Sequence, residues 1–125
     1  MPLLTAASAT TYELHGVRFH SFAASPSGAT SLAAWRADFP PHSVGAAHSL
    51  TAEEVLHVLS GSLEVQIDDD EFTARAGDAV LVPAGSRFRV SNADDVPASA
   101  WVATTLGMKA EIAEGGLQIA PPWAQ

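Results

Sequence analysis

The side chains best suited to chemistry lie in the stretch HSLTAEEVLHVLSG, residues 48 to 61. It contains an imidazole at His48 and two carboxylates at Glu53 and Glu54, and such groups can hold a metal ion or transfer protons. Leu50 lies two places after His48, at the spacing where a metal site of this kind would need a second histidine. The stretch is therefore compatible with a metalloenzyme, and also with a protein that has kept one imidazole and one carboxylate but no ion.

Length and composition indicate one globular domain. The chain has 125 residues, of which 47% are apolar, and a domain of this size can bury a core without metal or disulfide staples. The sequence has no cysteine, which excludes disulfides, thiolate metal ligands and cysteine nucleophiles.

The charge balance excludes some classes of partner. The net charge is −8, from 6 Lys and Arg against 14 Asp and Glu. Nucleic acid is not an expected partner, because binding to phosphates needs a basic surface. The opening MPLLTAASAT lacks the basic start and long apolar core of a signal peptide, and no apolar run approaches the ~20 residues of a membrane span. We expect a soluble cytoplasmic protein that does not bind membranes.

The hydrophobic pattern predicts short strands. Residues 63 to 67, LEVQI, alternate strictly and meet an acidic turn at residues 68 to 70, which indicates a hairpin. Similar runs at 30–39, 55–59, 79–82 and 99–106 are separated by Gly, Pro or Asp, as in an all-β sandwich or barrel. Little helix is expected: residues 51–54 are predicted to be one helical turn or a loop, and residues 108–112 another short helical piece. The tail QIAPPWAQ is expected to pack on the barrel or on a partner subunit.

One segment resembles the first motif of the cupin superfamily. That motif reads Gly, five residues, His, one residue, His, three or four residues, Glu, six residues, Gly. Aligned with this chain, its positions fall on His42, His48, Leu50, Glu54 and Gly61.

A second segment resembles the second cupin motif, which reads Gly, five residues, Pro, one residue, Gly, two residues, His, three residues, Asn. Its positions fall on Gly77, Pro83, Gly85, Phe88 and Asn92. The resemblance is to small single-domain bacterial cupins. It implies a cupin-type double-stranded β-helix, or jelly-roll barrel, with a single domain over residues 1–125. The barrel core is expected at about 30–106, between an N-terminal arm at 1–29 and a C-terminal tail at 107–125.

Two of the four metal-ligand positions of the cupin motifs are not occupied by metal-binding residues in this chain. Leu50 and Phe88 place hydrocarbon at two of the four ligand positions, whereas a transition-metal site usually needs at least three protein ligands. We therefore favour no metal cofactor. The alternative is a dioxygenase-type enzyme with a divalent transition metal held by His48, Glu54 and His42.

The same register predicts a ligand pocket inside the barrel. His48 and Glu54 would form a tentative acid/base pair and, if within hydrogen-bond reach, each would favour the charged form of the other. Trp35 and Arg36 point to opposite faces of one strand, so only one of them can face inward. The predicted lining residues are His48, Leu50, Glu54, Phe88, Trp35, Arg36 and Trp101. The remaining histidines, His15, His20 and His57, are expected outside this pocket.

The leading hypothesis is a cupin that binds a small, largely apolar organic molecule, with metal-free isomerase or cyclase chemistry if it is an enzyme. A second alternative, besides the metalloenzyme, is a non-catalytic sensor or structural dimer with a filled barrel. The resemblance also implies a homodimer.

Overall fold

The computed structural model describes residues 3–125, so Met1 and Pro2, which open the predicted N-terminal arm, lie outside the described residues. One sheet consists of β1 (Thr10–Leu14), β2 (Val17–Ala23), β3 (Leu32–Phe39), β5 (Glu54–Ser60), β8 (Ala79–Val82) and β10 (Ala98–Thr105). The other consists of β4 (His48–Leu50), β6 (Ser62–Ile67), β7 (Asp70–Arg75), β9 (Phe88–Ser91), β11 (Ala110–Ile112) and β12 (Gln118–Ile119). Three short 3₁₀ turns complete the described chain: η1 (Ala6–Ser8), η2 (Ser25–Ser27) and η3 (Pro122–Ala124).

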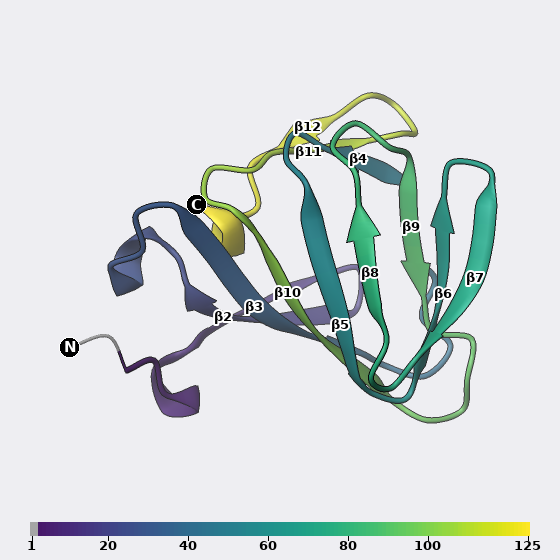
Figure 1. Cartoon of the computed structure of the whole chain (residues 1–125), viewed down its shortest axis with the longest axis horizontal. Helices are drawn as coiled ribbons and strands as arrows, with labels where there is room; N and C mark the ends of the chain where they lie inside the picture. Colours follow the sequence, from purple (N-terminus) through teal and green to yellow (C-terminus); the bar gives the residue numbers. More distant parts are fainter. Residues whose placement is uncertain (1–2) are drawn as a thin grey trace.

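The two sheets face each other as a jelly-roll barrel, which confirms the predicted all-β fold. Their strand orders are β1-β2-β3-β10-β5-β8 and β12-β11-β4-β9-β6-β7. The second sheet curves from β12, β11 and β4 at the top of Figure 1 to β9, β6 and β7 at its right. In the described part of the chain, no helix is long and apolar enough to cross a membrane.

Alternating burial along the strands places the core between the sheets. In β3, Ala33, Trp35, Ala37 and Phe39 are buried, while the residues between them are only partly covered. This is the pattern of a strand with one face on the core, because successive side chains point to opposite sides. One half of the barrel, between β5 and β8 and the β6–β7 hairpin, is filled by side chains that include Val58, Leu63 and Val82.

The N-terminal arm is more ordered than predicted. β1 and β2 pair as a hairpin, and β2 pairs with β3, so residues 10–23 extend the first sheet. A two-residue loop, His15–Gly16, joins the strands, and its φ angles of 52° and 81° are those of a type I′ turn.

Two predictions about the segments after the barrel core were tested. The helical piece expected at residues 108–112 is wrong, because residues 110–112 form β11, which pairs with β4. The C-terminal tail packs on its own barrel, one of the two outcomes expected. The Trp123 ring stacks on Phe19 with centroids 3.9 Å apart, and the Gln125 side-chain amide donates to the Met108 carbonyl at 2.7 Å.

Asn92, the last position of the second motif, fixes the loop that leads into β4. Its side chain is fully buried. The Nδ2 group lies 3.2 Å from the carbonyl oxygens of Phe39 and Pro40 and 2.9 Å from that of Val96. Its Oδ1 accepts from the backbone N–H of Asp94. These bonds satisfy backbone groups that would otherwise be buried without partners, and they hold the chain that delivers His48 to the barrel.

The same loop passes so close to β9 that only glycine fits at position 45. A Cβ atom on Gly45 would lie 2.0 Å from the Val90 carbonyl oxygen. His42, at the glycine position of the first motif, has φ 56°. That conformation is uncommon for a residue with a side chain, and it shows why the motif has glycine there.

We expect Gly45→Ala to lower the free energy of unfolding by about 3 kcal/mol or more, because the added methyl group meets backbone that cannot rotate away. Gly77→Ala is the matched control. Gly77 has φ 96° with open space around its Cα, so the change should cost only the left-handed strain of about 1–2 kcal/mol. Urea unfolding of both variants measures the difference, and equal losses would contradict the close approach.

Candidate functional site

A cavity of about 140 Å³ lies in the other half of the barrel. The first sheet contributes Leu14, Val17, Phe19, Trp35, Ala37, Phe39, Glu54, Leu56 and Val102. The second sheet contributes His48, Leu50, Phe88, Val90, Ala110, Ile112 and Ile119, and the connecting segments add His15, Gly45, Ala46, Met108, Pro121 and Trp123. For comparison, an apolar cavity of about 150 Å³ can hold benzene. This space counts against the filled-barrel alternative.

Five of the predicted pocket residues line this one cavity: Trp35, His48, Leu50, Glu54 and Phe88. The pairing of β4 with β9 explains why these side chains converge on the cavity. His48 lies directly opposite Phe88 across β4 and β9, with ring centroids 5.3 Å apart. Leu50 follows two residues later on the same face of β4. The side chains at the four motif ligand positions therefore meet as the resemblance implies, whatever their chemistry.

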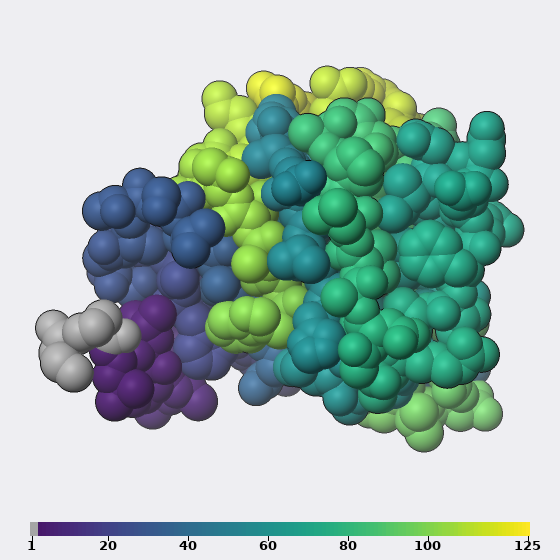
Figure 2. Space-filling view, viewed as in Figure 1, coloured from purple at the N-terminus to yellow at the C-terminus, as the bar shows by residue number. Residues whose placement is uncertain are grey.

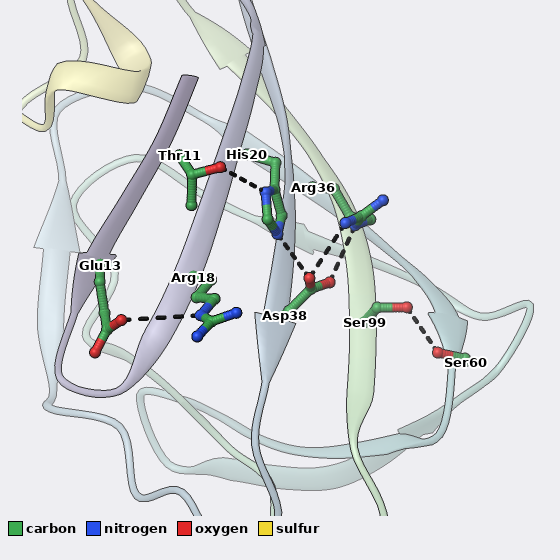
Figure 3. A network of polar contacts seen from close by, with 8 residues as sticks. All are labelled: Thr11, Glu13, Arg18, His20, Arg36, Asp38, Ser60 and Ser99. Atoms are coloured by element: carbon green, nitrogen blue, oxygen red, sulfur yellow. Dashed lines mark hydrogen bonds and ion pairs between the residues drawn. The ribbon is translucent and has the colours of Figure 1, made fainter. Parts of the chain in front are cut away.

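Arg36 and Trp101 do not line the cavity, which corrects their assignment. They are cross-strand partners on β3 and β10, and alternation places both on the outer face of the first sheet, away from Trp35. The Arg36 guanidinium binds Asp38 with an Nε–Oδ1 distance of 3.0 Å, and Asp38 also binds His20 at 2.7 Å (Figure 3). Trp101 packs against Phe22 with centroids 5.4 Å apart.

His42 lies apart from the cavity. It is 64% exposed and its Nε2 binds Asp95 Oδ1 at 2.7 Å, so it does not join His48 and Glu54. Within residues 3–125, no group of three or more His, Cys, Asp or Glu side chains is placed to hold a metal ion. The cavity wall carries the imidazoles of His15 and His48 and the carboxyl group of Glu54, but these three are not grouped as the three-ligand site that a cupin metal would need.

Glu54 is the most unusual group in the cavity. It begins β5 and is only 6% exposed. Within the described chain its carboxyl group has no hydrogen-bond or ion-pair partner. Burial raises its pKa to about 8, because the charged form loses its hydration without gaining a partner.

His48 is shifted in the opposite direction. Its Nδ1 lies 2.9 Å from the Ala46 carbonyl oxygen. A carbonyl oxygen can only accept, so Nδ1 carries the proton and Nε2 of the neutral ring is left as an acceptor. Burial lowers the pKa of His48, although the Ala46 bond acts against that shift.

The two groups do not form the ion pair that was expected if they lay within hydrogen-bond reach of each other. In the described structure no hydrogen bond or salt bridge joins His48 to Glu54, and each pKa moves toward the neutral form of its group. At neutral pH the cavity thus holds a carboxylic acid, which can donate, and an imidazole nitrogen, which can accept.

Sequence reasoning missed the contribution of the N-terminal hairpin and the tail to the cavity. His15 lines it from the tip of the β1–β2 hairpin, and Trp123 lines it from η3. The one local signal for the first of these is weak: Gly16 between the apolar residues Leu14 and Val17 suits the second position of a two-residue hairpin loop, but His15 is not the usual residue at the first. His57 is exposed on β5, outside the barrel as predicted.

Comparison with known proteins supports the family and the fold. No curated protein sequence matches the chain. The family model described as Cupin domain matches residues 35–104, which is more than half of the chain and contains both motifs.

Solved structures of similar fold include the polyketide cyclase RemF from Streptomyces resistomycificus, at 15% identity and a TM-score of 0.76, with 84% of this chain and 79% of that chain covered. A sugar phosphate isomerase of the cupin superfamily from Silicibacter pomeroyi has 20% identity and a TM-score of 0.70, with 96% and 93% covered. A Cupin 2 conserved barrel domain protein from Salinispora arenicola has 20% identity and a TM-score of 0.70, with 83% and 87% covered. At these identities the likeness is one of fold.

The family match covers more than half of the chain, and both motifs and the barrel agree with it. The chain belongs to the cupin superfamily.

Proposed function

We propose that this cupin binds a small, largely apolar carbonyl compound and moves a proton next to the carbonyl group, as an isomerase or cyclase does, without a metal ion. The observation that carries the proposal is the neutral acid Glu54 and the neutral base His48 on one apolar cavity of benzene size. Two of the similar folds belong to proteins described as a cyclase and an isomerase, which agrees with the proposal but does not carry it.

The proposed reaction uses both groups in the protonation states that burial favours. The His48 Nε2 lone pair takes a proton from the carbon beside the carbonyl group, while Glu54 gives its proton to the carbonyl oxygen. The products are an enol, an imidazolium and a carboxylate. In a ketone with a carbon–carbon double bond next to the acidic carbon, the enol is a dienol; the imidazolium returns its proton to the far carbon, the carboxylate takes back the enol proton, and the double bond has moved. In a dicarbonyl compound, the enol carbon attacks the second carbonyl and closes a ring, while the carboxylate takes the enol proton and the imidazolium protonates the new alkoxide. Both routes restore the two side chains.

The apolar wall sets the size and polarity of the ligand. Apart from Glu54, His48 and His15, the side chains on the cavity carry no ionisable group. An ionised group would not be stable deep in such a space. The part of the ligand held there should therefore be an uncharged hydrocarbon ring or chain that carries one carbonyl group for isomerisation or two for ring closure.

We also retain the homodimer as a proposal. Val55 and Leu59 on β5 and Leu81 on the edge strand β8 are exposed apolar side chains of the first sheet. These two strands form part of the surface seen in Figure 2. Exposed apolar residues at a sheet edge are commonly covered by a partner.

We expect the ionisation of Glu54 to appear in the pH dependence of stability. Its pKa of about 8 in the folded state lies above the ordinary value of 4.5 for a glutamate, so between these values the unfolded chain has lost a proton that the folded chain keeps. The free energy of unfolding should therefore fall as pH rises, by up to about 1.4 kcal/mol per pH unit. The lowered pKa of His48 acts in the opposite direction below the ordinary histidine value of 6.5, so the clean window is from about pH 7 to about pH 8.

The variant Glu54→Gln should lose this slope, as measured by urea unfolding at several pH values within the window. Glu53→Gln, which alters the exposed neighbour, should keep the slope of the native protein. Equal slopes in the native protein and Glu54→Gln would show that Glu54 is ionised at neutral pH.

The proton-transfer step can be tested without knowing the natural substrate. In D₂O at neutral pH, the protein should exchange the protons beside the carbonyl group of cyclohexanone for deuterium, followed by loss of their NMR signal. His48→Gln and Glu54→Gln should each slow the catalysed exchange by about 100-fold or more, whereas His57→Gln, outside the barrel, should have the native rate.

Metal content separates this account from the dioxygenase alternative. Elemental analysis of protein purified without chelator should find well under one transition-metal ion per chain. One ion per chain that is lost in His48→Ala, together with exchange that depends on it, would overturn the proposal.

A further inference from the structure

We infer that His15 binds a carboxylate at the mouth of the cavity, so that the ligand class is a small cyclic oxo acid, with its ketone between His48 and Glu54 and its carboxylate at the surface. This inference rests on the proposed function and specifies the ligand of the same site. It assigns to His15 a role in specificity, separate from the proton transfer.

The position of His15 supports this role. It is exposed at the tip of the β1–β2 hairpin and yet contributes to the wall of the cavity. The other ionisable residues of the wall, His48 and Glu54, are partly or fully buried. His15 is therefore the ionisable residue of the wall that meets both the cavity and water.

The backbone conformation of His15 gives a second, independent observation. Both residues of the type I′ loop have positive φ, 52° at His15 and 81° at Gly16. Asn, Asp or Gly is preferred at the first of these positions, and His is a less common choice there, although it adopts positive φ more often than most residues with a side chain. The turn alone would be better served by Asn–Gly. A residue that is worse for the turn and faces a cavity is a candidate for a functional role.

The chemistry of the cavity decides which group His15 would bind. A carboxylate deep in the cavity would be costly, because the inner wall is apolar apart from His48 and Glu54 and a buried charge needs a partner, so the charged end of a ligand is expected at the mouth. An imidazole N–H at the mouth can donate to a carboxylate, and the bond is stronger when the ring is protonated. The net charge of the chain is −8, so a donor at the entrance would offset the general repulsion of an anion.

The test compares two ligands, cyclohexanone and a cyclohexanone carboxylate whose carboxylate lies opposite the ketone, with dissociation constants from NMR titration. The native protein should bind the carboxylate about 10-fold more tightly, as expected for one charge-assisted hydrogen bond. His15→Asn and His15→Gly both suit the turn, so neither should unfold the protein. Each should bring the ratio of the two dissociation constants to about 1, because the carboxylate then has no donor at the mouth, whereas His57→Gln, outside the barrel, should keep the native ratio.

The outcomes separate the two claims. If cyclohexanone binds and exchanges but the carboxylate has no advantage, or if the advantage survives in both variants, the role of His15 is wrong and the proposed function stands. If neither ligand binds the native protein, both claims fail. A stability in His15→Asn equal to or above the native value, with the carboxylate preference lost, distinguishes ligand binding from a structural role in the turn.

Discussion

The burial of one unpaired carboxyl group, that of Glu54, is the constraint from which the rest of the site follows. In a metal-binding cupin motif this position would face a cation and two or three imidazoles. Here Leu50 and Phe88 take the places of two ligands, and the imidazole that remains, His48, is turned by its Nδ1 bond to the Ala46 carbonyl. Without a cation or a hydrogen-bond donor beside it, the carboxyl group avoids the cost of a buried charge by keeping its proton. The same apolar surroundings lower the pKa of His48, so one change of environment produces both an acid and a base.

The scaffold holds this pair in a way that does not depend on a metal ion. His48 is delivered by the loop that Asn92 and Gly45 fix against β9, and Glu54 starts a strand paired on both sides, with β8 and β10. Both lie on regular, well-paired backbone, which is where a catalytic group is held most accurately. By contrast, the outer boundary of the cavity comes from a hairpin tip, a short edge strand and a 3₁₀ turn. The part of the barrel that the family model matches, residues 35–104, thus positions His48 and Glu54, while segments outside it complete the wall of the cavity.

Much of the barrel could be predicted because its signals are local. Strict alternation in residues 63–67, and turn residues at regular intervals, reveal strands whatever the rest of the chain does. The two motifs placed His48, Leu50, Glu54 and Phe88 on one cavity because motif spacing on paired strands fixes which side chains share a face. β11 was misjudged since three residues carry almost no periodic signal and its strand character comes from pairing with β4. The hairpin of β1 and β2 was missed because its turn residue, His15, is not the usual one for a type I′ loop.

Other features depend on three-dimensional surroundings that the sequence does not display. Alternation established that Trp35 and Arg36 face opposite ways, but only the assembled sheets show that Trp35 faces the cavity and that Arg36 and Trp101 lie outside. The sequence left open whether His48 and Glu54 lie within hydrogen-bond reach, and the charged forms were expected only in that case. In the described structure no hydrogen bond or salt bridge joins them, and burial shifts each pKa toward the neutral form.

The proposed function depends most directly on the protonation state of Glu54, which carbon-13 NMR of the side-chain carboxyl group can measure, with assignment by its absence in Glu54→Gln. The chemical shift should be that of a protonated acid at neutral pH and should titrate with a midpoint near the pKa of about 8. A carboxylate signal at neutral pH, with a midpoint near the ordinary glutamate value of 4.5, would mean that Glu54 is solvated or paired with a cation. That result would contradict the neutral acid–base pair on which the proposed function is built.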